Sequence, residues 1–428
     1  MNCCADLEER IAELEATTAR KGNRKVSLTI SGWVGEQVMW WDDGVQSNVY
    51  VVGLGTTLAS HFKMTGQAQI MPGYSAGYVI HVEVISSDAL TVSQFAPIGP
   101  AATAGTSLPG YYVQLLQSYW FVKSDHLGKV GVGLQSQASD NTAILPDGSG
   151  SLVPANWVAF EYSSFFIRTN GTGIGSGAGT FGPTWGSTGG CVGGGAIGDC
   201  NGLTQHVIRY DSPTFGGFSV SASWGEDDMW DVAARYAGEH HGFKFSVAAA
   251  YNELQGPNLA TAIAPANVEY FQIGAYAQHV HSGLWLYGAY GHNEYEGLTG
   301  DADVYYIKGG LRRRWHPLGH TVLYGEYEQA DSSGALVSRT CAACTGGDND
   351  ATSSEFKMWG VGLVQEIDAA AMSMWLSYRH MEYSDNGCLD AFIGGVCRGK
   401  LPTGSPIPGR GTSYQDFQYV KFGALINF

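Results

Sequence analysis

Alternation of apolar and polar residues with a period of two is the feature that most limits how this chain can fold. From residue 26 onward it recurs in sixteen segments, among them "FKFSVAAAYNEL" at 243–254 and "LWLYGAYGHNEYE" at 284–296. Successive side chains of a β-strand point to opposite faces, so each segment has one apolar and one polar face. Most segments are about ten residues long, which suits a tilted strand that crosses a bilayer. The pattern therefore predicts an all-β protein.

The links between these segments alternate between tight and long. Seven are tight, near residue 72 and at 125–128, 214–217, 240–242, 281–283, 316–319 and 368–371. The links that alternate with them lie near 42–58, 88–109, 139–204, 226, 255–267, 297, 331–354 and 385–413. All of these are long except those near 226 and 297. This alternation describes an up-and-down meander with both ends on the tight-turn side. A soluble β-sandwich would show no such asymmetry.

Composition favours a membrane-embedded sheet. Charged residues make up 14% of the chain, against about 25% in ordinary soluble domains, and no run of eighteen apolar residues could form a transmembrane helix. Because backbone amides cannot stay unpaired in lipid, such a sheet must close on itself. We therefore predict a closed 16-stranded antiparallel transmembrane β-barrel over residues 25–428. The net charge of −16 lacks the basic footprint of a nucleic-acid-binding protein.

Residues 1–24 are predicted to form a separate N-terminal segment. Leu7, Ile11 and Leu14 are spaced as on one face of a short helix. Two heptads are too few for a stable free coiled coil, so a trimeric coiled coil tied to the barrel and a helix packed on its own barrel both stay open. The segment has no apolar signal-peptide core, so the chain is either a mature exported protein with an added Met or a cytoplasmic one.

Six of the eight cysteines form close pairs within short loop-like stretches. The disulfide candidates are Cys191 with Cys200, Cys341 with Cys344 and Cys388 with Cys397. Such pairs favour disulfides and an oxidising compartment, and hence export by a signal peptide that this chain does not contain. Zinc binding is the alternative, but CxxC occurs once and has no second half. Cys3 and Cys4 have no assigned role.

The final segment, "VKFGALINF", resembles the C-terminal signature of Gram-negative outer-membrane barrels, which the barrel assembly machinery reads. Phe422 and Phe428 carry this assembly signal. With the strand count and loop asymmetry, the chain resembles a trimeric general porin, and its opening residues are similar to alphaproteobacterial porins of the Bradyrhizobium and Rhodopseudomonas type. The resemblance implies a homotrimer in the outer membrane, in contact with lipopolysaccharide and with its short turns in the periplasm. It also implies passive diffusion of ions and small hydrophilic solutes.

In such porins the third loop folds into the barrel and narrows the pore, which implies this role for residues 139–204. Strand parity adds the charges that face the lumen. The pore-lining and constriction candidates are Lys63, Glu83, Asp147, Glu161, Arg168, Arg209, Arg235, Lys308, Arg312, Arg314, Arg379 and Lys421. Parity also places Lys357 and Glu294 inside, and Trp285 and Tyr287 on the lipid face.

The charged residues of the pore and of the outer loops predict opposite ion selectivities. The resemblance implies a basic ladder on the wall, with Lys63, Arg312, Arg314, Arg379 and Lys421 as its members, facing an acidic loop. The third loop, however, has few acids, and the basic wall alone would favour anions. The net charge and the acidic outer stretches "WWDDG", "GEDD" and "GGDND" would instead concentrate cations at the mouth. The sequence therefore predicts a mild preference for cations.

Catalytic and ligand-binding motifs do not add another function. We find no GxSxG, HExxH or phosphate-binding loop, so we expect no enzyme and no cofactor. No complete set of metal ligands is evident, and the six histidines at the tight turns (His240, His241, His279, His281, His316 and His320) are expected to be polar rim residues rather than a metal or pH sensor. The alternative functions are a substrate-selective channel, for example for sugars along an aromatic slide, and a barrel adhesin.

Overall fold

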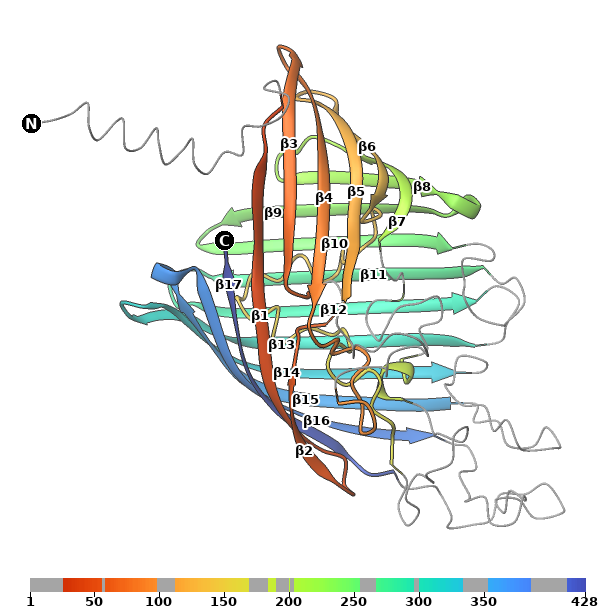
Figure 1. The fold of residues 1–428 in the computed structure, drawn as a ribbon, viewed down its shortest axis with the longest axis vertical. Coiled ribbons are helices and arrows are strands. Elements are labelled where there is room, and N and C mark those ends of the chain that lie inside the picture. Colours follow the sequence, from red (N-terminus) through yellow and green to blue (C-terminus); the bar gives the residue numbers. More distant parts are fainter. Residues whose placement is uncertain are drawn as a thin grey trace, which may run out of the picture.

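Antiparallel strands form most of the described part of the computed structural model (Figure 1). The structure describes residues 26–55, 58–97, 112–168, 184–189, 200, 204–254, 267–295, 300–333, 353–385 and 414–428. The strands are β1 (Thr29–Asp42), β2 (Ser47–Val52), β3 (His61–Met71), β4 (Tyr74–Ile85), β5 (Tyr112–Ser124), β6 (Gly128–Gln135), β7 (Gln205–Asp211), β8 (Phe218–Gly225), β9 (Trp230–His240), β10 (Phe243–Leu254), β11 (Val268–His279), β12 (Leu284–Tyr295), β13 (Asp301–His316), β14 (Gly319–Ser333), β15 (Ser353–Ile367), β16 (Met372–Asp385) and β17 (Phe417–Asn427).

Short 3₁₀ turns are the helical elements of the described ranges: η1 (Trp185–Ser187), η2 (Glu226–Asp228) and η5 (Asp368–Ala370). Among the same residues, no helix has the length and apolar character needed to cross a membrane. The predicted N-terminal helix and the boundary at residue 24 lie outside the described residues, as do Cys3 and Cys4.

The first two strands modify the predicted strand count. The link 42–58 was expected to be a loop, but it contains β2, which pairs with the second half of β1 from Gln37 to Asp42. The first half of β1, from Thr29 to Trp33, pairs instead with β3. Thus β2 and β3 follow one another beside β1 and share one strand position. The seventeen strands occupy sixteen positions, as predicted.

The ring is closed by the two ends of the described barrel. β1 pairs with β17 from Trp33↔Asn427 to Asp42↔Gln418. Beyond this ladder, the amide of Gly32 donates to the carbonyl of Phe428 at 3.1 Å, and the amide of Phe428 donates to Gly32 at 3.0 Å. This pairing removes the sheet edge, as a membrane requires. The prediction of a closed 16-stranded antiparallel barrel is confirmed.

All seven predicted tight turns join neighbouring antiparallel strands. The turn between β5 and β6 shows why glycine is needed there. Gly128 has a φ of +91°, and a Cβ on it would lie 2.2 Å from the carbonyl oxygen of Asp211. An L-residue would therefore be strained and would clash with the neighbouring strand. The glycine fixes the tight-turn end of the barrel near β7.

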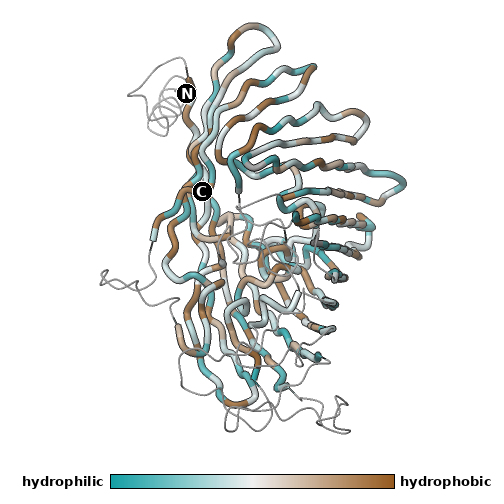
Figure 2. The backbone as a smooth tube through the Cα atoms, turned by 90° about the vertical axis from the view of Figure 1, so that its right-hand side faces the viewer, coloured by the Kyte–Doolittle hydropathy of each residue, from teal (hydrophilic) through white to brown (hydrophobic). Residues whose placement is uncertain are grey.

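Hydrophobic and hydrophilic residues alternate along the strands (Figure 2). Two charged residues predicted to face inward lie instead on the outer face. Lys357 shares its face with Trp359, which is 45% exposed, and pairs with Glu355. Glu294 shares its face with the exposed Leu286. Both predictions were wrong because apolar residues occur on both faces of these strands, so polarity alone does not set the parity.

Two aromatic residues show the opposite error. Trp285 and Tyr287 were predicted to face lipid, but they are 5% and 2% exposed. The exposed residues of this strand are Leu284 and Leu286. The hydroxyl of Tyr287 donates a 2.6 Å hydrogen bond to the carbonyl of Ala143 in the third loop. Strand β12 therefore turns Trp285 and Tyr287 inward, where the third loop covers Tyr287.

The third loop leaves β6 and crosses the inner face of the sheet, with residues 136–168, 184–189, 200 and 204 described. Its apolar side chains join wall residues in one buried cluster. The ring of Tyr162 stacks on Phe356 of β15 at 6.3 Å, and Phe165 meets Trp41 of β1 edge-on at 5.1 Å. Trp157 is fully buried. The insertion predicted for 139–204 is therefore present in the described residues.

Candidate functional site

Buried cations on β13, β16 and β17 fasten the third loop to the wall; we call this region the latched wall. Lys308 of β13 is 1% exposed. Its ammonium group donates to the Asp147 carboxylate at 2.7 Å and to the carbonyl of Ala155 at 2.5 Å. Asp147 and Ala155 both belong to the third loop. Lys308 thus holds the loop by a charge pair and by a backbone hydrogen bond at once.

Arg379 of β16 makes the second buried contact. Its guanidinium donates to both oxygens of Glu326 at 2.8 and 2.9 Å, and to the loop carbonyl of Asn156 at 2.8 Å. Arg379 is 1% exposed and Glu326 is 6% exposed. Such bidentate geometry fixes the planar fork of an arginine. The same Nη2 therefore joins Glu326 to the loop, while Nη1 donates to the hydroxyl of Tyr419 at 3.3 Å.

Lys421 of β17 makes the third contact, an ion pair with Glu161 of the loop. Gln37 of β1 donates to the same carboxylate at 3.4 Å. Burial alone would raise the pKa of Glu161, but the charges of Lys421 and Arg379 hold the pKa below its ordinary value. The Glu161 carboxylate is therefore ionised inside the loop contact rather than free in the lumen.

A further pair fixes the loop near the outer end of β1. Arg168 donates to the carboxylate of Asp43 at 2.7 Å, and both side chains are almost fully buried. The amide of Gln94 donates to the same carboxylate at 3.1 Å. This pair joins the third loop to the hairpin between β1 and β2. Arg168 is therefore an anchor of the loop.

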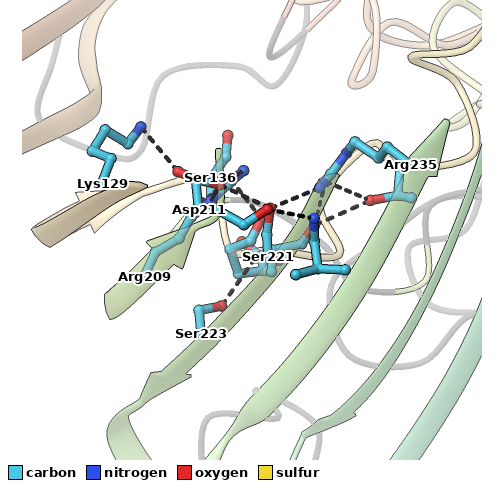
Figure 3. A network of polar contacts seen from close by, with 12 residues as sticks. Lys129, Ser136, Arg209, Asp211, Ser221, Ser223 and Arg235 are labelled. Atoms are coloured by element: carbon cyan, nitrogen blue, oxygen red, sulfur yellow. Dashed lines mark hydrogen bonds and ion pairs between the residues drawn. The ribbon is translucent and has the colours of Figure 1, made fainter. Parts of the chain in front are cut away.

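The opposite wall, formed by β3 to β9, carries cations that the loop leaves partly uncovered; we call it the open wall. Arg209 of β7 forms a two-nitrogen contact with Asp211 at 2.8–2.9 Å and donates to the carbonyl of Ser136 at 2.9 Å (Figure 3). Lys129 of β6 pairs with the same Asp211 at 3.0 Å. Lys63 of β3 lies on the same wall, on the face of β3 that carries the buried His61.

Arg235 of β9 completes the group. Its guanidinium donates to Ser221 at 2.8 Å and to the loop carbonyl of Ala138 at 2.7 Å (Figure 3). Asp231 on the same strand accepts from the amide and hydroxyl of Ser139, each at 2.7 Å. The start of the third loop is thus held by backbone and hydroxyl contacts. The two open-wall arginines, Arg209 and Arg235, line a cavity beside the loop.

This cavity has a volume of about 290 Å³ and includes Lys129, Arg209 and Arg235 in its lining. Asp140 of the loop also lines it. Burial raises the pKa of the Asp140 carboxyl to about 6, although a hydrogen bond with Ser136 and the charge of Arg209 act against this rise. Near neutral pH, a modest pH change will therefore alter the charge of the cavity.

The remaining candidates lie apart from both groups. Glu83 of β4 is buried and accepts a 2.6 Å hydrogen bond from Gln114. Arg312 pairs with Glu366 at 2.7 Å, and Arg314 pairs with Asp368 at the tight-turn end. The expected ladder is therefore not one array, because Arg379 and Lys421 hold the loop, Lys63 lies on the open wall and Arg312 and Arg314 approach the turns.

Sequence reasoning missed two charged residues of the open-wall cavity, Lys129 and Asp140. Lys129 could have been found, because Val130 and Val132 mark the outer parity of β6 and leave Lys129 inside. Asp140 carried no periodic signal, since it lies in the loop. Cys200 is disulfide-bonded and buried. The other five disulfide candidates lie outside the described residues.

The chain is similar to Gram-negative porins in sequence and in fold. A sequence profile described as Gram-negative porin matches residues 12–386. The fold resembles an anion-selective porin from Comamonas acidovorans, with 14% identity, a TM-score of 0.55 and coverage of 94% of this chain and 100% of that one. It also resembles the trimer form of OmpT from Vibrio cholerae (12% identity, TM-score 0.51, coverage 94% and 99%). OmpF of Salmonella typhi in complex with daunomycin gives 12% identity, a TM-score of 0.51 and coverage of 94% and 98%. A search of curated proteins found no match.

Proposed function

The chain belongs to the Gram-negative porin family, and from this premise we propose that its pore narrows between the third loop and the open wall and favours small anions there. The barrel lies in the outer membrane and forms a water-filled channel through which ions and small hydrophilic solutes diffuse passively. We propose that three of the twelve charged candidates, Lys63, Arg209 and Arg235, line the pore together with Lys129. Six others anchor the third loop (Asp147, Glu161, Arg168, Lys308, Arg379 and Lys421), and Glu83, Arg312 and Arg314 belong to neither group.

The distribution of accessible charge supports the preference for anions. Lys63, Lys129 and Arg209 are partly exposed on the inner face. The inward carboxylates Glu83, Asp231, Glu326 and Glu328 are buried instead, whereas Asp211, whose side chain is 22% exposed, offsets one of these cations. Of the loop residues outside the described ranges, 169–183 contain no charged residue and 190–199 contain only Asp199. The proposal departs from the expected mild preference for cations, because the net charge also counts acids on the outer face.

Planar-bilayer recording across a potassium chloride gradient tests this proposal. We expect a zero-current potential of the sign that chloride permeation gives. The variant Lys357→Gln is a matched control, since it removes a positive charge from the outer face and should leave the potential unchanged. A potential of the opposite sign, set by potassium, would overturn the anion preference while leaving the channel itself established.

A sugar-selective channel is the less favoured alternative. It would need aromatic side chains exposed along the lumen. Trp157, Trp285 and Tyr287 are instead buried between the third loop and the wall, where a solute cannot stack on them. The family match favours a channel over an enzyme, and we propose that the chain has no catalytic activity. An adhesive role of the outer loops has no supporting observation among the described residues.

We propose a homotrimer, with the outer face of β1 and β2 in the interface. That face exposes Ile30, Val34, Val49 and Val51, each more than half exposed, and a second copy would cover them in place of lipid. The related Vibrio cholerae barrel has a trimer form. Mass photometry of the detergent-purified protein should give the mass of three chains, and a single-chain mass under the same conditions would exclude the trimer.

The remaining assignments are extensions of the family membership. We propose that residues 1–24 form a trimeric coiled coil or a helix on the barrel, and that Cys200 is bonded to Cys191. We also propose assembly through Phe422 and Phe428, contact with lipopolysaccharide, and a place among alphaproteobacterial porins. Deleting residues 2–24 and measuring trimer dissociation on heating tests the coiled coil, because an unchanged dissociation temperature contradicts it.

A further inference from the structure

Three buried side chains of the kinds that bind metal ions lie together on the inner face of β3 and β4. They are His61 of β3 and His81 and Glu83 of β4, which are 7%, 8% and 0% exposed. We call this group the histidine cluster. It is separate from the open-wall cavity, and its histidines are not those of the tight turns. The proposed solute path does not use it.

Strand register places the three side chains at the corners of a triangle. β3 and β4 lie side by side, with His61 directly opposite Glu83 in their antiparallel ladder (Figure 1). His81 precedes Glu83 by two residues and therefore shares its face. Directly opposite residues have their Cβ atoms only about 4.5–5.5 Å apart. Two ligands on one strand and a third on its neighbour are thus within reach of a single ion.

The imidazole of His81 gives a second, independent indication. Both of its ring nitrogens are buried, and neither has a hydrogen-bond partner. A buried polar atom without a partner costs free energy, so such atoms normally face a protein group, a bound water or an ion. The ring of His81 lies against that of His61, with their centroids 4.3 Å apart. A metal ion bound between the two rings would satisfy the nitrogen of His81 that carries the lone pair.

The other two side chains are oriented by groups around them. The Nδ1 of His61 donates a 3.0 Å hydrogen bond to the carbonyl of Ala59, so the lone pair of the neutral ring is on Nε2. The ring of Trp33 packs edge-on against His61 at 4.1 Å. Gln114 donates to Oε2 of Glu83 at 2.6 Å. Hydrogen bonds of this kind orient the imidazole and carboxylate ligands of metal sites.

We propose that His61, His81 and Glu83 bind Zn²⁺. Two imidazoles and one carboxylate are a ligand set that zinc accepts, with its fourth position left to water. The donor atoms of the three side chains are not all within 4.8 Å of one another. Binding therefore requires the ring of His81 to turn, and no hydrogen bond of its nitrogens holds it.

One neighbouring charge opposes this ion. Lys63 lies directly opposite His81 in the ladder, and its ammonium group repels a cation. The carboxylate of Glu83 offsets that charge within the same pair of strands. Bound Zn²⁺ would tie β3 to β4 through side chains, in addition to the backbone ladder.

Isothermal titration calorimetry of Zn²⁺ into the full-length protein tests the proposal. The protein is purified in detergent, treated with EDTA and then freed of the chelator. We expect saturable Zn²⁺ binding that an excess of Ca²⁺ does not displace, because calcium prefers oxygen ligands. Absence of Zn²⁺ binding, or its displacement by Ca²⁺, would overturn the proposal.

Variants separate the histidine cluster from the histidines at the tight turns. His81→Gln should weaken Zn²⁺ binding by about 100-fold or more, since even a lost outer partner of a ligand costs about 10–100-fold. His279→Gln combined with His281→Gln is the matched control, because it removes a turn pair whose ring centroids are 6.4 Å apart. Unchanged binding in His81→Gln, or loss of the binding in the control, refutes the site.

A further variant covers the case in which His81→Gln does not fold. Gln114→Leu removes the hydrogen bond to Glu83 and keeps all three ligands, so Zn²⁺ binding should weaken by about 10–100-fold. An unchanged dissociation constant contradicts the proposal. These readouts do not involve conductance, so their failure leaves the anion proposal untouched.

Discussion

The latched wall and the open wall use the same residue types for different purposes. On the latched wall, Lys308 and Arg379 are 1% exposed and bind carboxylates and loop carbonyls. On the open wall, Arg209 also binds loop carbonyls, but its side chain stays 19% exposed beside a cavity. Burial by the third loop decides the difference. A charge beneath the loop holds it in place, whereas a charge beside it sets the local field.

Removing a buried cation from the latched wall should cause the largest loss in the free energy of unfolding. Arg379→Met keeps much of the side-chain volume but leaves Glu326 buried without its cation. We expect a loss of about 3–5 kcal/mol in the free energy of unfolding, because an uncompensated buried charge is left behind. Unfolding in guanidinium chloride, followed by tryptophan fluorescence, measures it.

Arg314→Met is the matched control for this loss. Its pair with Asp368 is 48% exposed on both sides, so its removal should change the free energy of unfolding by about 0–1 kcal/mol. If the two variants are equally stable, burial beneath the loop does not determine how much a cation contributes to the free energy of unfolding.

A smaller loss should follow from Tyr287→Phe. This change removes the hydrogen bond to the loop carbonyl of Ala143 and leaves that oxygen without its donor. We expect a loss of about 1–3 kcal/mol. Tyr305→Phe, on the exposed face of β13, should change the free energy of unfolding by only about 0.5 kcal/mol or less. If Tyr287→Phe leaves the free energy of unfolding unchanged, the result contradicts the hydrogen bond to the loop and supports the original prediction that Tyr287 faces lipid.

These residues also show how far sequence alone reaches. The strands and the tight turns followed from the period of two and from the alternation of the links, whereas the insertion of the third loop followed from the resemblance to porins. The side on which Tyr287 lies did not, because Leu286 and Tyr287 are both apolar enough for lipid. The contacts of Lys308 with Asp147 and of Lys421 with Glu161 join residues 161 and 260 positions apart. No local sequence pattern encodes such pairs. The cations of the open wall can be told apart from the loop anchors only when the contacts of the loop are known.

On the open wall, removing charge should change selectivity more than stability. Lys129→Gln combined with Arg209→Gln removes two cations from the cavity. We expect the chloride-to-potassium permeability ratio to fall by about twofold or more, since fixed charges control the local ion concentration. The free energy of unfolding should change by about 1 kcal/mol for each partly exposed pair that is lost, less than for the buried Arg379. The ratio comes from zero-current potentials in a salt gradient. A large loss of stability with an unchanged ratio would make these residues anchors, like those of the latched wall.

The smallest expected effect is a pH dependence from Asp140. Its carboxyl faces Lys129, Arg209 and Arg235 across the cavity, and it accepts a 2.8 Å hydrogen bond from Asn141. Because burial raises its pKa to about 6, the group is mostly ionised at neutral pH and becomes neutral as the pH falls below that value. Protonation removes a negative charge from a basic cavity, so the anion preference should increase between about pH 7 and pH 5. Asp140→Asn should show the low-pH preference already at pH 7 and a weaker dependence on pH. Comparing the two proteins isolates this carboxyl from other titrating groups, and an identical pH profile in both would remove Asp140 from the constriction.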